Sequence, residues 1–99
     1  MNDSAPSPWR RTMGITHDEF LRSLPPALKG AAFSAEGPQI TIPWSPGVIH
    51  ITLGPQGSRR LGSLSLPTTE VEIRFEGLSQ GQADAFLQGF QRAFQRGGG

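Results

Sequence analysis

Apolar and polar residues follow two different periods along the chain. Over residues 16–24 the apolar side chains are three or four positions apart, as on a helix with one buried side. Over residues 33–76 the spacing falls to two, which is typical of strands, and over residues 79–95 it returns to the helical period. The pattern therefore predicts the element order α-β-β-β-β-α.

The first helix has a clear start and stop. Thr16 and Glu19 have the spacing of a capping box, in which each side chain bonds the other residue's backbone amide. Pro25-Pro26 should end regular hydrogen bonding, because proline lacks the amide donor. A further turn over residues 26–28 is compatible with proline at a first helical position, and Gly30 offers a left-handed stop.

Alternation and turn residues divide the middle of the chain. Pro43 favours an edge position for its strand, and Leu64 and Leu66 are expected to share the apolar face of theirs. Turns are expected at 45–47, 54–58 and 67–69. The sequence does not decide whether the short run at Phe33 joins the sheet. The four strands of the predicted order are 40–44, 48–53, 60–66 and 70–76.

The last helix supplies most of the expected core. Ser79 and Gln82 repeat the capping-box spacing, and one stripe of the helix carries Ala83, Phe86, Leu87, Phe90 and Phe94. The strands have one apolar and one polar face, so both helices should cover the same side of the sheet. We expect an α+β fold, a two-layer sandwich of an antiparallel meander sheet with both helices on one face.

The chain length of 99 residues fits one domain. Residues 1–13 combine Asn, Asp, Ser and two prolines and lack an apolar period, so they are expected to form a disordered N-terminal tail. Residues 14–96 form the predicted single α+β domain, and residues 97–99 a flexible glycine tail. Gly and Pro supply 13 and 9 residues, which leaves a large share of the chain for turns and tails.

Composition excludes several classes of site. The absence of cysteine removes disulfides, thiolate metal sites and thiol nucleophiles. A net charge of +1 gives no strong field to attract nucleic acid, so nucleic-acid binding is not expected. No apolar run is long enough to cross a membrane, and no secretory leader is recognisable at the start. We expect a cytoplasmic protein without membrane contact and without a cofactor.

Candidate catalytic groups do not form a recognisable constellation. His17 and His50 have no spacing that brings them together, so no metal site is predicted. Glu70, Glu72 and Glu76 share the outward face of one strand, where a solvated row is the ordinary interpretation. Serines lack the elbow motif of a nucleophile. No catalytic residue is predicted, and the chain is expected not to be an enzyme.

Two segments carry side chains suited to contacting a ligand or partner. The segment 54–60 combines glycines with Arg59 and Arg60, and it could hold a phosphate or simply form a solvated turn. Near the start, an indole beside two guanidiniums suits a membrane surface, a phosphate or a partner groove, and a plain solvated tail is the alternative. The predicted contact residues are Arg59, Arg60, Trp9, Arg10, Arg11 and Trp44.

Three functions remain open from the sequence. The first is a small non-enzymatic binding or adaptor module, with a protein partner or homodimerisation through a strand edge. The second is a small-molecule or phosphate-binding protein that uses Arg59 and Arg60. The third rests on residues 97–99, which resemble the diglycine end of ubiquitin-like modifiers and sulfur carriers. That resemblance implies a carrier function, although those families place a strand before the tail where this chain predicts a helix.

Overall fold

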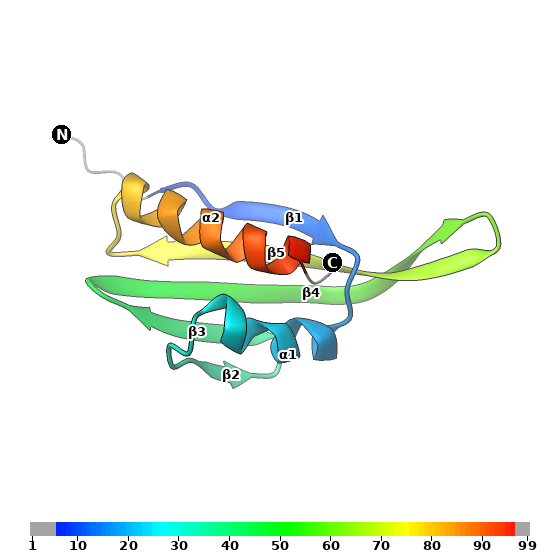
Figure 1. The fold of residues 1–99 in the computed structure, drawn as a ribbon, viewed down its shortest axis with the longest axis horizontal. Helices are drawn as coiled ribbons and strands as arrows, with labels where there is room; N and C mark the ends of the chain where they lie inside the picture. The colour runs from blue at the N-terminus through cyan, green and yellow to red at the C-terminus, as the bar shows by residue number, and fades with distance from the viewer. Residues whose placement is uncertain (1–5, 97–99) are drawn as a thin grey trace.

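The computed structural model describes residues 6–96, which contain two helices and one antiparallel sheet of five strands (Figure 1). The sheet order is β1-β5-β4-β3-β2, so β2 to β5 form a meander and β1 adds to the side of β5. The elements are β1 (Trp9–Met13), α1 (His17–Ala27), β2 (Ser34–Glu36), β3 (Gln39–Trp44), β4 (Gly47–Leu61), β5 (Leu64–Glu76) and α2 (Gln80–Arg96).

Both helices lie on the same face of the sheet, which confirms the predicted two-layer α+β sandwich (Figure 1). Alternate strand residues point toward the helices and are buried, while their neighbours face the opposite side, which we call the outer face. The strand residues of the core are Ile40, Ile42, Ile49, Ile51, Leu53, Val71, Ile73 and Phe75.

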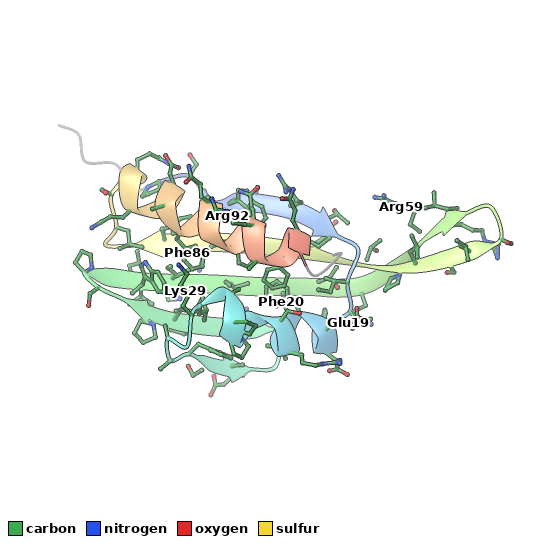
Figure 2. The ribbon with its side chains drawn as sticks, viewed as in Figure 1. Glu19, Phe20, Lys29, Arg59, Phe86 and Arg92 are labelled. Carbon is green, nitrogen blue, oxygen red and sulfur yellow. The ribbon has the colours of Figure 1, made fainter. Side chains whose placement is uncertain are left out.

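A row of phenylalanines joins the two helices to the sheet. Phe86, Phe90 and Phe94 are four residues apart on α2, and their neighbouring ring centroids are 5.9 and 4.6 Å apart. Phe20 of α1 stacks on Phe94 at 4.9 Å. Figure 2 shows Phe20 and Phe86 between the helices and the sheet. Phe90 is only 1% exposed, so the centre of the row is fully packed.

The start of α1 matches the sequence, and its end extends further than expected. The Thr16 hydroxyl accepts from the Glu19 amide at 3.1 Å, and the Glu19 carboxylate accepts from the Thr16 amide at 3.0 Å. The helix continues through Pro25 and Pro26 to Ala27. Proline removes only its own donor, and the Leu28 amide still bonds the Leu24 carbonyl at 2.9 Å. Burial of both leucines holds this last turn in place.

Residues 9–13 form β1, so the prediction that residues 1–13 are a disordered tail is wrong for this part. Trp9 pairs with Ile73 and Met13 with Thr69. The Trp9 ring packs edge-on against Phe90 at 5.7 Å, and Met13 is 8% exposed. Trp9, Arg11 and Met13 thus face the helix side, and the apolar period was hidden because its middle position is an arginine. Residues 1–5, and the predicted glycine tail 97–99, lie outside the described residues.

The region predicted as three strands, 48–53, 60–66 and 70–76, is instead one long hairpin of β4 and β5. Gly62 has a φ of 61°, and Leu61 pairs with Leu64 across a two-residue turn. Positive φ at the first turn residue is the feature that a tight hairpin turn requires of glycine. The expected turn at 54–58 is a bulge between Leu53 and Gln56, which absorbs the extra residues without breaking the ladder.

The edge of the sheet opposite β1 is formed by β2. The Phe33 segment does join the sheet, as β2, which pairs with β3 from Ser34↔Thr41 to Glu36↔Gln39. Pro43 lies beyond the last residue of β3 that β2 pairs with, so β3 is open on that side at the proline. The turn between Trp44 and Gly47 lies where the sequence predicts it.

Gly47 and Gly89 should respond in opposite directions to replacement by alanine. A Cβ at Gly47 would collide with the Glu76 carbonyl oxygen and lie 2.8 Å from the Gly77 carbonyl carbon. We expect Gly47→Ala to lower the free energy of unfolding by about 1–3 kcal/mol. A Cβ at Gly89 meets nothing within 4 Å, so Gly89→Ala should raise it by about 0.5–1 kcal/mol. Urea denaturation measures both, and a stable Gly47→Ala variant would contradict the close approach.

Thr69 should contribute to stability through a buried hydrogen bond. It is fully buried, and its hydroxyl donates to the Ile15 carbonyl at 2.7 Å. Thr69→Val keeps the shape but leaves that carbonyl without its partner, which should cost about 1–3 kcal/mol in thermal or urea unfolding. Thr12→Val on the exposed side of β1 is the matched control and should change stability by less than about 0.5 kcal/mol. Equal effects of the two variants would disprove the assignment.

Candidate functional site

The hairpin of β4 and β5 extends well beyond the helices (Figure 1). We call its outer part, residues 56–69, the arm. In the arm the strands pair from Gln56↔Thr69 to Leu61↔Leu64. The 15 residues of β4 span about 50 Å, whereas the 17 residues of α2 span about 25 Å. Roughly half of the hairpin therefore has no helix to cover it.

The arm carries the exposed large apolar side chains of the described residues. Leu61 is 53% exposed, Leu64 63% and Leu66 41%. Leu61 lies opposite Leu64, and Leu66 is two residues further along β5, so all three share one face of the ribbon. Leu64 and Leu66 share one face of their strand, as the sequence predicts, but that face is exposed because the core ends before the arm begins.

A short sequence signal identifies the arm. The residues Leu61-Gly62-Ser63-Leu64 have a glycine followed by serine between two apolar residues, which is a pattern of two-residue hairpins. This pattern predicts that the strands on either side of the turn pair as one long hairpin, in place of two separate short strands. A ladder of that length cannot be covered by the helices, so its last leucines must be exposed. Leu61, Leu64 and Leu66 were missed because the bulge at Gly54-Pro55 resembles a turn.

Arg59 and Arg60 lie on the arm, but they point to opposite faces. They are consecutive residues of β4, where Arg59 pairs with Leu66 and Arg60 with Ser65. Arg59 therefore shares the leucine face, and Figure 2 shows it on the arm away from the helices. The predicted loop at 54–60 is part of a strand ladder. The two guanidiniums therefore do not converge on one side of the arm, where they could bind the same anion.

The N-terminal arginines are also divided between faces. Arg10 lies on the outer face, where its guanidinium bonds the Glu72 carboxylate at 2.8 Å. Arg11 lies on the helix side, with its guanidinium carbon 5.0 Å from the centre of the Trp9 ring. Trp44 packs edge-on against Phe86 at 5.2 Å. Both tryptophans therefore belong to the packing around α2, and the structure does not gather the predicted contact residues into one site.

A hollow of about 460 Å³ lies on the outer face where the arm meets the sheet. Glu70 and Glu72 line it, together with Arg10 of β1 and Thr52 of β4. Within residues 6–96 Arg10 pairs with Glu72 and the His50 ring contacts Glu76, so Glu70 takes part in neither contact. Once Arg10 is paired with Glu72, the exposed carboxylate left at the hollow is Glu70.

His17, His50 and the Ser79 hydroxyl have structural partners in the fold. The His17 ring lies 2.7 Å from the Gly54 carbonyl, and the His50 ring lies 2.8 Å from the Glu76 carboxylate. The Ser79 hydroxyl caps α2 by accepting from the Gln82 amide at 3.1 Å. Within the described part of the chain, no three His, Asp or Glu residues are close enough together to hold a metal ion. No helix in residues 6–96 is long and apolar enough to cross a membrane.

The arm with its leucine face and the hollow at its base are thus surface features of residues 6–96 that the core does not explain. Leu61, Leu64 and Leu66 remain largely exposed, and Arg59 lies on the same face of the ribbon. Comparison with protein-family models, with curated proteins and with solved structures gives no match for this chain.

Proposed function

We propose that this chain is a small non-enzymatic protein-interaction module and that the arm is its binding element. The observation that carries the proposal is the exposure of three leucines on one face of a two-stranded ribbon. Contiguous apolar side chains on a protruding element are characteristic of interaction sites. Covering a leucine fully contributes roughly 1.5–3 kcal/mol, so a partner that enclosed this face would gain substantial binding energy.

The charge of the arm defines the chemistry of the partner. Arg59 lies beside the leucines and Arg60 lies on the reverse side, and residues 56–69 include no Asp or Glu. A suitable partner surface is an apolar groove with carboxylates at its rim, because arginine pairs well with carboxylate in two-point geometry. The partner protein supplies the groove, and the arm supplies the anchor residues.

The alternative functions have less support. Phosphate or small-molecule binding needs the two guanidiniums to converge and backbone amides to be available, whereas the arginines lie on opposite faces of a paired ladder. Thermal stabilisation by inorganic phosphate that Arg59→Ala abolishes would favour it. The carrier function depends on residues 97–99, which lie outside the described residues. A cytoplasmic location stays a companion prediction, which cell fractionation tests.

Photo-crosslinking from the arm tests the proposal. A photoreactive phenylalanine analogue is placed at Leu64 of the full chain, which is then irradiated in a native lysate. We expect a discrete protein adduct, because Leu64 is 63% exposed at the centre of the proposed contact face. The matched control carries the same analogue at Gln88. This residue is exposed on α2 and lies outside the arm.

The position dependence of the adduct decides the outcome. A protein adduct from position 64, lost when Leu61 and Leu66 are changed to serine, supports the interaction module. Equal labelling from positions 64 and 88 would mean random collision. Adducts only with lipid or nucleic acid from position 64 would contradict a protein partner.

A further inference from the structure

The edge of the sheet formed by β1 is open on one side. Within residues 6–96, β1 is the terminal strand of the sheet and pairs with β5 alone. In an antiparallel pair, alternate residues direct their amide and carbonyl groups toward the partner, and the residues between them direct theirs outward. The middle residues Arg10, Arg11 and Thr12 are exposed. β1 therefore presents backbone donors and acceptors that can pair with one more extended strand.

A groove of about 110 Å³ follows this edge between β1 and α2, which lie side by side in Figure 1. Its apolar lining comes from Trp9 and Met13 of β1 and from Phe90 and Phe94 of α2. The Trp9 ring meets Phe90 edge-on at 5.7 Å, and this contact joins the two walls. A strand added beside β1 would thus find backbone partners on the edge and an apolar groove for its alternate side chains.

The polar lining of the groove suits a peptide with a negative charge. Gln91 and Gln95 are four residues apart on α2, so they share one flank of the helix, and both line the groove. Their amide groups both donate and accept hydrogen bonds. Of the described residues that line the groove, Arg11 is the charged one, and its guanidinium carbon lies 5.0 Å from the centre of the Trp9 ring. Arg92, next to Gln91, adds an exposed cation on α2 (Figure 2).

The acidic residues of the neighbouring elements leave this positive charge in place. Glu70 and Glu72 of β5 line the hollow on the outer face of the sheet. Asp84 of α2 accepts a hydrogen bond from Gln80 at 2.9 Å, about two turns before Gln91. The charge at the groove is therefore positive, and it favours an occupant with a carboxylate, which arginine binds through two parallel hydrogen bonds.

The same arginines make a second copy of this chain a poor occupant of the edge. Antiparallel pairing of two β1 strands about a two-fold axis at Arg11 puts two guanidiniums directly opposite each other, and an axis at Arg10 does the same. Like charges directly opposite across a strand pair are destabilising. An acidic strand from another protein is the complementary occupant.

We propose that the groove between β1 and α2 is a second binding site, which takes an extended acidic segment of a partner protein as an added strand beside β1. One carboxylate of the segment lies opposite Arg11 and sets the register. The side chains two residues to either side of it enter the apolar groove, because alternate residues of a strand share a face. The residues lining the groove lie outside the arm, so the inference goes beyond the proposed function. A chain with two such sites can link two proteins.

Peptide titration of the isotopically labelled full-length chain, followed by NMR, tests the site. The probe is a capped peptide with one central glutamate, valines two positions to either side of it and threonines between. The matched probe carries lysine in place of the glutamate. We expect the glutamate peptide to shift the amide resonances of residues 9–14 and 90–95 and to bind with a dissociation constant below about 1 mM. The lysine peptide should bind about tenfold more weakly or worse.

Arg11→Glu reverses the charge of the groove. It should raise the dissociation constant of the glutamate peptide about tenfold or more and make the lysine peptide the tighter binder. Arg22→Glu is the matched control, because it makes the same change of charge at an exposed position of α1, and it should change the constant by less than about threefold. Gln91→Glu opposes the carboxylate from the helix wall and gives a second measurement if circular dichroism shows that Arg11→Glu folds poorly.

Methylation of the peptide nitrogens separates strand addition from charge attraction alone. An added strand pairs with β1 through one of its two edges. Methyl groups on one alternate set of its amides should therefore abolish binding, whereas methyl groups on the other set should not.

No shift with either peptide at about 1 mM would overturn the site and show that the arginines only protect the edge from pairing. Equal binding of the two peptides, equal effects of Arg11→Glu and Arg22→Glu, or equal effects of the two methylated sets would also overturn it. Loss of peptide binding in the Leu61→Ser, Leu64→Ser, Leu66→Ser variant would place the peptide on the arm instead. If the groove fails, a position-dependent adduct from Leu64 still supports the arm, so the two proposals can fail separately.

Discussion

The packing of the α2 phenylalanine row on the sheet is the contact on which the rest of the structure depends. Phe86, Phe90 and Phe94 occupy one stripe of the helix, and the rings of Phe20 and Trp9 close around them. Burying such rings contributes several kcal/mol, which exceeds the cost of two glycines in the same helix. Everything this row covers belongs to the core, and whatever extends past it is exposed to water.

The arm follows from that limit. The hairpin has about twice the length of α2, so its outer part extends past the helices. The bulge between Leu53 and Gln56 marks where the buried face of the strands ends. Apolar side chains that stay in water add little to the folding stability of the monomer. A two-stranded hairpin without further packing is only marginally stable. The exposed leucines are therefore not explained by the packing of the monomer, and the proposed interaction module rests on them.

Most of the fold could be predicted from the sequence where local signals and burial agree. The capping box at Thr16, the alternation over 70–76 and the stripe on α2 each combine a local preference with a buried side, and the structure confirms them. Strand β1 was missed because its partners lie some 60 residues away along the chain. The leucine face was missed because alternation shows which residues share a face, but cannot show whether anything covers that face. Arg59 and Arg60 could be named from the sequence as contact candidates, but their separation onto two faces follows only from the strand register.

The central claim is that the leucines of the arm lie outside the cooperative core. Urea unfolding of the Leu61→Ser, Leu64→Ser, Leu66→Ser triple variant tests this most directly, at a concentration where the chain is monomeric. The account predicts a free energy of unfolding within about 1 kcal/mol of wild type, since exposed substitutions have small effects. A loss of several kcal/mol, the size expected for truncating buried leucines, would show that the arm packs into the monomer and would contradict the account.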